Sequence, residues 1–368
     1  MRDEIFPHVF YMAIDKSKLF SLFDNIKQEH RDSSGNVIVK QRTRNSDVLI
    51  IDGTNRFIST FCVTPTLNDN GEHVGGVTGF LTSIGYAIKL LTPTRVIIVF
   101  DGKGGSQRRR AIYPDYKSGR KPIKRLNRAY DDLLDAAGEE KNMYHQMSIL
   151  ADFLTSLPVT VLSIDYIEAD DVIAYLAHHV FSKPEEKVTI MSADKDFYQL
   201  INERVSVWSP VKKKVYGIQD IVNEYGIYPW NFVFYRILDG DKSDNIDGIK
   251  GVGRKTAIKR FPMLTERTQV ELEKLLSYAM DRSNENTVYA NVTENCDKVT
   301  RNHMLMQLAE PSISGALQTQ ILDSVKTYYE LNKFAFVQKL TRYSMHHSIP
   351  NHHVWIQSVF YPLSVFKD

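Results

Sequence analysis

The sequence predicts an α/β protein in which a parallel β-sheet is flanked by helices. Short runs rich in β-branched residues are apolar on both faces, as the buried strands of a parallel sheet are. Segments with helical periodicity lie between these runs, which favours right-handed strand–helix–strand crossovers. The 368 residues, 43% of them hydrophobic, are enough for a large core and one or two domains.

The expected elements follow one another along the chain. Residues 167–181 carry apolar side chains about 3.6 residues apart, which predicts a helix, and the pattern is mostly helical from 218 to 340. We divide the chain into an N-terminal extension (1–46, a short helix, a turn and a linker), an α/β core (47–217) and a helical C-terminal region (218–368). The expected strands are residues 48–51, 95–100, 159–164, 187–191 and 205–208.

Composition excludes several classes of protein. The formal net charge is only +2, so net charge alone does not indicate nucleic-acid binding. The two cysteines, Cys62 and Cys296, form neither a zinc pattern nor a disulfide framework, and a reducing cytosol is the simplest setting. No run of about 18 apolar residues exists, and the N-terminus lacks the apolar core of a signal peptide. We expect a soluble, cytoplasmic protein that does not bind membranes.

Acidic residues follow the expected strands. Asp52, Asp101 and Asp194 come directly after, or within three residues of, three apolar runs. Ligand sites of open α/β sheets lie at the carboxyl ends of the strands, so these side chains should converge. Five separated segments supply the acids, which are Asp52, Asp101, Glu168, Asp170, Asp171, Asp194, Asp196, Asp241 and Asp244.

Carboxylates packed at one edge repel and need compensating cations. Oxygen ligands suit Mg²⁺ or Mn²⁺, and no thiolate or histidine cluster argues for zinc. Two such ions about 4 Å apart can activate a water and stabilise the leaving oxygen of a phosphodiester. Each segment also has a simpler explanation: a turn after a strand, acids at the start of a helix, or Asp194 or Asp196 capping a helix at 197–201. All five explanations holding together is much less plausible than a metal site.

The glycine-rich segment 248–257 is predicted to be a hairpin between two helices. Arg254 separates Gly253 from Lys255, so the segment does not match a Walker phosphate loop. Gly251 and Gly253 let the backbone approach phosphates, and Lys255 adds a cation near the start of the next helix. Such a hairpin grips a duplex without reading its sequence. The alternative is a plain helix–helix turn.

A basic stretch follows Asp101. Tyr113, Tyr116 and Tyr130 are interleaved with its cations, and this combination suits single-stranded nucleic acid, although a solvated helix face is the usual alternative. Lys117 or Arg120 could neutralise charge on the scissile phosphate. The basic residues are Arg108, Arg109, Arg110, Lys117, Arg120, Lys121, Lys124, Arg125 and Arg128.

Six ordered motifs resemble the flap endonuclease / 5′-3′ exonuclease family, which includes phage 5′ nucleases, the ribonuclease H of T-even-type phages and the 5′-nuclease domain of bacterial DNA polymerase I. They span about residues 47–262 and read IIDGTN, VFDGKGG, YPDYKSGRK, IEADDVIAYLA, SADKDFYQL and GDKSDNIDGIKGVGRKTA. The resemblance implies a PIN-like core, a helical arch at about 104–150, a helix–three-turn–helix motif and a helical C-terminal region. Residues 1–46 and 263–368 match no family motif, and we expect the tail, 361–368, to pack against the protein.

The resemblance also implies roles for individual residues. Two Mg²⁺ ions, which Mn²⁺ can replace, would lie near Asp52, Asp101, Glu168 and Asp170 for the first ion, and near Asp171, Asp194, Asp196, Asp241 and Asp244 for the second. Lys117 and Arg120 would act in catalysis together with Asp52, Asp101, Asp170 and Asp194. A K⁺ ion often occupies the hairpin in relatives. The expected DNA contacts are Arg108, Arg109, Arg110, Tyr116, Lys117, Arg120, Gly251, Gly253 and Lys255.

The expected function is a structure-specific 5′ nuclease that removes RNA primers and flaps during replication. Its substrate would be a DNA or RNA–DNA duplex with a 5′ end or flap, and its partner a single-strand binding protein or sliding clamp. We expect a monomer in the cytoplasm, that of the host cell if the chain is phage-encoded. The alternatives are a PIN-type ribonuclease acting on single-stranded RNA and a catalytically silent DNA-junction binding protein.

Overall fold

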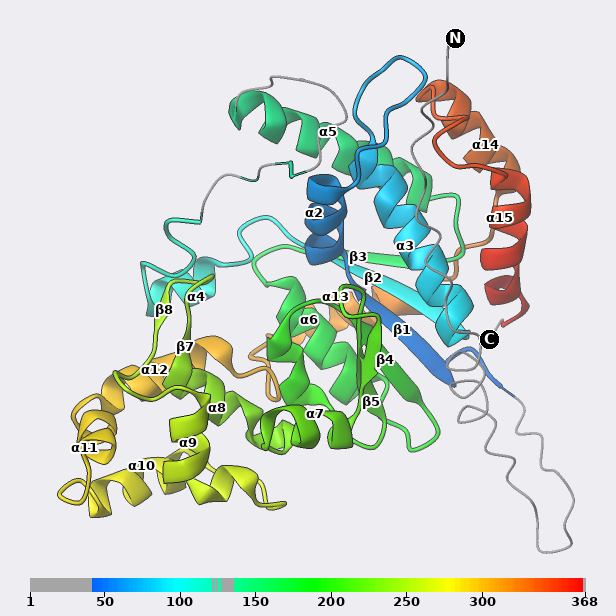
Figure 1. The fold of residues 1–368 in the computed structure, drawn as a ribbon. Coiled ribbons are helices and arrows are strands. Elements are labelled where there is room, and N and C mark those ends of the chain that lie inside the picture. The colour runs from blue at the N-terminus through cyan, green and yellow to red at the C-terminus, as the bar shows by residue number, and fades with distance from the viewer. Residues whose placement is uncertain (1–41, 121–122, 124, 127–135, 367–368) are drawn as a thin grey trace, which may run out of the picture. The chain divides into compact units, whose positions relative to one another are not determined.

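A six-stranded sheet lies at the centre of residues 43–368, which form one compact unit (Figure 1). The computed structural model describes residues 42–120, 123, 125–126 and 136–366. The strand order is β3-β2-β1-β4-β5-β6. The strands are β1 (Asp47–Asp52), β2 (Arg95–Asp101), β3 (Thr160–Ile164), β4 (Lys187–Met191), β5 (Val205–Ser209) and β6 (Lys214–Tyr216).

Strands β1 to β5 are parallel, which confirms the five expected strands. The sixth, β6, pairs antiparallel with β5, so the predicted parallel sheet carries one antiparallel strand at its edge. The short connection 210–213 can join only antiparallel neighbours, because a parallel crossover needs a dozen or more residues. The sheet is therefore mixed.

The strand order places the carboxyl ends of three strands next to one another. Strand β1 lies between β2 and β4, with Asp52 in register with Val99 and Ile51 in register with Met191. The order reverses between β1 and β4, and open α/β sheets bind their ligands at such a switch point. The predicted acids Asp52 and Asp101 end β1 and β2, and Asp194 follows β4.

Helices bury both faces of the sheet. In β1, Leu49 and Ile51 point to one face, while Val48 and Ile50 point to the other. On the first face the rings of Phe153 and Phe336 lie 4.9 Å apart and join the middle of the chain to its C-terminal region. The helices of this face are α2 (Gly53–Val63), α3 (Gly75–Leu91), α5 (Ala136–Leu154), α14 (Lys333–Arg342) and α15 (His352–Val359) (Figure 1).

The second face carries α6 (Ala169–Tyr175) and most helices of the C-terminal region. The helix expected at 167–181 is confirmed as α6, which continues as a π-helix, Leu176–Val180. The C-terminal region is helical as expected, apart from a small antiparallel pair, β7 (Gly240–Asp241) and β8 (Ile246–Asp247). Besides α14 and α15, the helices of this region are α7 (Ile218–Tyr225), α8 (Phe232–Asp239), α9 (Arg254–Arg260), α10 (Leu272–Asp281), α11 (Thr287–Glu294), α12 (Cys296–Met306) and α13 (Gly315–Lys326).

The predicted arch is described in part. Helix α4 (Gln107–Ile112) and most of α5 fall within its predicted range of about 104–150, whereas residues 121–122, 124 and 127–135 lie outside the described residues, as do 1–41 of the extension. The tail packs as expected up to residue 366: Leu363 is buried, and the tail forms a 3₁₀ helix, Tyr361–Val365. No helix in the described part of the chain is both long and apolar enough to cross a membrane.

Candidate active site

The acids at the strand ends are held in place by hydrogen bonds to backbone amides and to Ser192. Asp52 ends β1 and caps α2, its Oδ1 accepting from the Asn55 amide at 3.1 Å. Its Oδ2 accepts from the Ser192 hydroxyl at 2.8 Å. Asp101 ends β2, and its Oδ1 accepts from the Ala169 amide at 2.9 Å. These bonds connect β1 to the loop after β4, and β2 to the start of α6.

Asp194 lies on the turn that follows β4. It caps the 3₁₀ helix Lys195–Leu200, and its Oδ1 accepts from the Asp196 amide at 2.8 Å. Its own amide donates to Ser192 Oγ at 3.0 Å, so one serine joins Asp52 to Asp194. The predicted capping role is correct. It is compatible with a metal role because the second carboxylate oxygen makes no hydrogen bond among the described residues.

Acids from separate segments act on one another electrostatically. Burial, with smaller contributions from Asp101 and Asp194, raises the pKa of Asp52 to about 7. Burial and the charges of Asp52 and Asp194 raise the pKa of Asp170 well above its ordinary value. Burial and the charges of Asp194 and Asp241 raise the pKa of Asp196 to about 7, although Arg236 opposes them. The segments predicted to converge do so, and we call the nine predicted acids the acid cluster.

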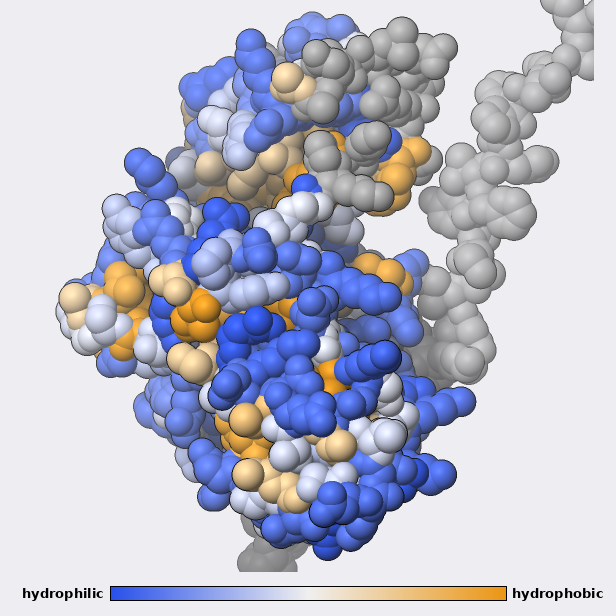
Figure 2. All heavy atoms as spheres, turned by 90° about the vertical axis from the view of Figure 1, so that its left-hand side faces the viewer, coloured by the Kyte–Doolittle hydropathy of each residue, from blue (hydrophilic) through white to orange (hydrophobic). Residues whose placement is uncertain are grey.

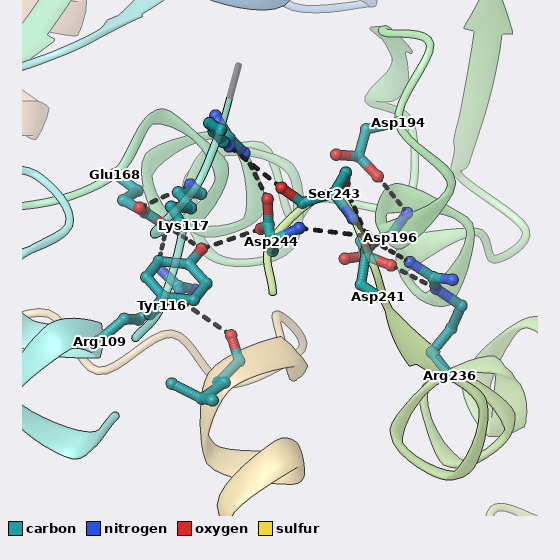
Figure 3. Close-up of polar contacts among 12 residues, drawn as sticks. Arg109, Tyr116, Lys117, Glu168, Asp194, Asp196, Arg236, Asp241, Ser243 and Asp244 are labelled. Carbon is teal, nitrogen blue, oxygen red and sulfur yellow. Dashed lines mark hydrogen bonds and ion pairs between the residues drawn. The ribbon is translucent and has the colours of Figure 1, made fainter. Parts of the chain in front are cut away.

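One side of the acid cluster is neutralised by cations from α4 and the turn after it. Arg109 donates to Glu168 Oε2 at 2.7 Å and to both oxygens of Asp171 at 2.6 and 3.0 Å. Lys117 donates to Glu168 Oε1 at 2.7 Å. Figure 3 shows Arg109, Tyr116 and Lys117 gathered around Glu168. Burial would raise the pKa of Glu168, but Arg109 and Lys117 outweigh it and hold that pKa below its ordinary value.

Asp244 links this side to the β7–β8 pair. The Tyr116 hydroxyl lies 3.0 Å from Glu168 Oε2 and 3.2 Å from Asp244 Oδ2, and burial together with the Glu168 charge raises its pKa. The Lys117 amide donates to the Asp244 carbonyl at 2.8 Å, and the Arg120 guanidinium pairs with the Asp244 carboxylate. Lys117 has a φ of +58°, a conformation that non-glycine residues rarely adopt. Tyr116, Lys117 and Arg120 are thus held beside predicted metal ligands.

Arg236 of α8 neutralises the opposite side, and the sequence did not identify it. Its Nε donates to Asp196 Oδ1 at 2.8 Å, and its terminal nitrogen pairs with Asp241 Oδ2 (Figure 3). Burial would raise the pKa of Asp241, but hydrogen bonds from Ser243 and the charge of Arg236 hold it below its ordinary value. A lone arginine in an apolar helix shows no partner, so no sequence pattern points to Arg236. Ser192 lies within the SADKD motif, where no local pattern marks it as a partner of Asp52.

The basic residues predicted to contact DNA differ in exposure. Arg108 and Arg110 are exposed, whereas Arg109 is 5% exposed and its guanidinium is occupied by Glu168, Asp171 and the Leu305 carbonyl. Asp171 in turn uses both oxygens on Arg109. This geometry favours a buried ion pair, and the predicted roles of Arg109 on DNA and Asp171 on metal stay predictions.

The predicted hairpin joins α8 to α9, as expected for a helix–three-turn–helix motif. Gly251 has a φ of +82°, and a Cβ built there would meet nothing within 4 Å. Gly253 caps α9 in extended backbone, and Lys255 is exposed in the first turn of that helix. No neighbouring segment packs closely enough against Gly251 or Gly253 to require a glycine there, so the tip of the hairpin is open to a ligand. Figure 2 shows that the face carrying β7, β8 and α11 is mostly hydrophilic.

The composition of the acid cluster fits hard divalent cations. Its ligands are carboxylate oxygens, and only Arg109, Lys117, Arg120 and Arg236 form ion pairs with the nine acids in the described residues. As placed, no group of three or more His, Cys, Asp or Glu side chains among residues 42–120 and 136–366 is close enough to hold a metal ion. Carboxylates that repel each other and pair with basic side chains are expected to close only around an added cation.

Comparisons with known proteins agree with this geometry. The family described as 5′-3′ exonuclease, N-terminal resolvase-like domain, matches residues 47–226. The 5′-3′ exonuclease of Aquifex aeolicus is 35% identical over 210 residues, which are 57% of this chain and 66% of that protein. The thermostable DNA polymerase I of Thermus thermophilus is 35% identical over 213 residues, or 58% of this chain and 23% of the polymerase. The chain thus spans less than two thirds of these two relatives.

Solved structures show the same fold. The T5 D15 protein, crystallised with metal ions, superposes with a TM-score of 0.54 at 17% identity and covers 81% of this chain and 98% of that one. At such identity the similarity establishes the fold alone.

A sequence relative establishes the family. The 5′-3′ exonuclease of Buchnera aphidicola (subsp. Schizaphis graminum) is 32% identical over 218 residues, which are 59% of this chain and 70% of that protein. The chain therefore belongs to the 5′-3′ exonuclease family of nucleases.

Proposed function

We propose that this chain is a structure-specific 5′ nuclease that hydrolyses phosphodiesters of DNA or RNA–DNA duplexes at 5′ ends and flaps. The observation that carries the proposal is the convergence of buried acids from five segments beside cationic side chains and an open hairpin. A solved relative by fold, the flap endonuclease of bacteriophage T5, forms a complex with DNA and metal ions. Primer removal in replication is the role that such an activity would serve.

The acids would hold two Mg²⁺ or Mn²⁺ ions. Asp52, Asp101, Glu168 and Asp170 would serve the first ion, and Asp171, Asp194, Asp196, Asp241 and Asp244 the second. Bound ions would supply an activated water and charge stabilisation at the leaving oxygen. The chain's own residues hold the carboxylates in place through Ser192, Arg109 and Arg236.

Lys117 and Arg120 would bind the scissile phosphate. Both now pair with acids of the cluster, Lys117 with Glu168 and Arg120 with Asp244. A cation that neutralised those acids would release both side chains towards a phosphate, where their charge stabilises the transition state. Tyr116 would keep the turn in place through its contacts with the same two acids.

The hairpin would grip the duplex part of the substrate. Gly251 and Gly253 leave the backbone accessible, Lys255 adds a cation, and K⁺ in the hairpin remains part of the proposal. Arg108 and Arg110 are the exposed cations of α4 and would contact the nucleic acid. We also propose, from the family resemblance, a monomer in the cytoplasm, that of the host cell if the chain is phage-encoded, which works with a single-strand binding protein or a sliding clamp.

A cleavage assay separates this proposal from its alternatives. A 5′-labelled flap duplex, a blunt duplex and a single-stranded RNA are incubated with the protein, with Mg²⁺ or with EDTA. We expect Mg²⁺-dependent cutting of the flap substrate at the junction or from its 5′ end. Preferential cutting of single-stranded RNA would instead identify a PIN-type ribonuclease. Flap binding without cutting at any Mg²⁺ or Mn²⁺ concentration would identify a silent junction-binding protein.

A further inference from the structure

The last two residues of α12 bond to two side chains, Arg109 and Gln199, that support acid-bearing segments. Arg109, which holds Glu168 and Asp171, donates through Nε to the Leu305 carbonyl at 2.8 Å. Gln199 donates through Nε2 to the Asp196 carbonyl at 2.8 Å and to the Met306 carbonyl at 3.0 Å. Two consecutive carbonyls of one segment are therefore bonded to the supports of two separate acid-bearing turns.

Gln199 is almost fully used in this arrangement. It is 5% exposed, and its Oε1 accepts from the Leu308 amide at 2.8 Å. Each of its two N–H groups can serve one carbonyl, so the side chain joins the turn of Asp196 to both ends of a short segment, residues 306–308. A polar group buried this deeply costs free energy when it loses a partner. The three hydrogen bonds of Gln199, which we call the bracket, therefore hold the Asp196 turn rigidly against residues 306–308.

We propose that Gln199 is a positioning residue for the metal-binding acids. Residues 305–308 hold the segment of Glu168 and Asp171 in place through Arg109, and the turn of Asp194 and Asp196 through Gln199. Asp194 caps the 3₁₀ helix Lys195–Leu200, which contains both Asp196 and Gln199, so the hydrogen bond to Met306 fixes where this turn lies relative to Glu168. The supporting segment lies outside the region that the family match covers, 47–226, and in a part of the chain without recognisable motifs. The C-terminal helices therefore complete the site rather than merely enlarging the protein.

This inference rests on the proposed metal-binding function of Asp194 and Asp196. Partners that orient metal ligands change metal affinity or activity about 10- to 100-fold when they are removed. The substitution Gln199→Met keeps the length and removes all three hydrogen bonds. We expect it to weaken Mn²⁺ binding about tenfold, measured by calorimetry without nucleic acid, and to leave flap-duplex binding in EDTA unchanged. Raised Mn²⁺ should restore cleavage.

Gln146→Met is the matched control. Gln146 is fully buried on α5, where its Oε1 accepts from the Gly76 amide at 2.8 Å and its Nε2 donates to the His73 carbonyl at 2.7 Å. Because Gln146 is as buried and as fully hydrogen-bonded as Gln199, Gln146→Met should lower the melting temperature about as much as Gln199→Met. Because Gln146 supports no acid of the cluster, the substitution should leave Mn²⁺ affinity unchanged. Equal Mn²⁺ weakening in both variants, or none in Gln199→Met, would overturn the proposal.

A metal-independent measurement separates the inference from the proposed function. Amide hydrogen exchange at residues 194–196 should quicken in Gln199→Met and not in Gln146→Met. If wild type binds no Mn²⁺, the proposed function fails, while quickened exchange would still support the bracket. If Gln199→Met does not fold, the milder Gln199→Asn, which keeps an amide but not its reach, should show the same changes to a smaller degree. Wild-type exchange and Mn²⁺ affinity in Gln199→Asn would then overturn the proposal.

Discussion

The acid cluster has two parts that differ in whether their buried carboxylates are paired with basic side chains. Glu168 and Asp171 are buried but paired with Arg109, and the pKa of Glu168 lies below its ordinary value because Arg109 and Lys117 outweigh the effect of burial. Asp52 and Asp170 form no ion pair among the described residues, and burial with neighbouring carboxylates raises their pKa. Arg109 and Lys117 already balance charge in the first part, whereas a bound cation would favour the charged form of the carboxylates in the second part.

The largest effect should come from the unpaired part. Asp170→Asn removes a predicted ligand of the first ion, and we expect turnover on a flap duplex to fall at least about 100-fold, because even groups that only orient ligands can contribute that much. Asp194→Asn should likewise lose most of its turnover. Duplex binding in EDTA should persist in both, since the hairpin is untouched. Turnover within a few-fold of wild type would remove that residue from the metal site.

The paired part should respond in stability. Asp171→Asn leaves Arg109 buried with half of its ion pairs, and breaking a buried pair typically costs about 3 kcal/mol. We therefore expect the free energy of unfolding, measured in urea without metal, to fall by about that amount. Asp170→Asn is the control, because it relieves repulsion and should not destabilise the metal-free protein. A destabilisation by Asp170→Asn equal to that of Asp171→Asn would contradict the division into two parts.

Divalent cations should stabilise the folded chain through the unpaired part. Mg²⁺ at about 100 times its dissociation constant adds about 2.7 kcal/mol to the free energy of unfolding when only the folded state binds it. Thermal unfolding with MgCl₂, compared with NaCl at matched ionic strength, measures the effect. In Asp170→Asn the gain should shrink. The same gain in wild type and Asp170→Asn would place the bound ion elsewhere.

Without metal, stability should depend on pH in a direction set by the raised pKa values. Folded Asp52 holds its proton up to about pH 7, while the unfolded carboxyl releases it near 3.8, so the folded state binds more protons between these values. The free energy of unfolding then falls as pH rises from 4 to 7, by at most about 1.4 kcal/mol per unit for one such proton. Urea unfolding at pH 5 and 6.5, in wild type and Asp52→Asn, should show a shallower slope in the variant. Equal slopes would show that Asp52 is not the group responsible.

The acids at the ends of strands could be predicted from the sequence. The basic side chains that pair with the acids from other helices could not. Asp52 and Asp101 end apolar β-branched runs, and strand order in an α/β sheet then brings them together. Arg236 and the pairing of Arg109 with Asp171 depend on side chains from distant helices, which leave no local pattern. The antiparallel β6 and the two-residue strands β7 and β8 are likewise too short for periodicity to reveal.

The central claim is that acids from separate segments hold divalent cations where a phosphate can reach Lys117. Anomalous scattering from Mn²⁺ in crystals of the protein tests it most directly. The account predicts two peaks about 4 Å apart, one bounded by Asp52, Asp101 and Asp170 and the other by Asp194, Asp196 and Asp241. A cluster that stays free of Mn²⁺ at saturating concentration, with its acids still paired to Arg236 and Lys117, would contradict it.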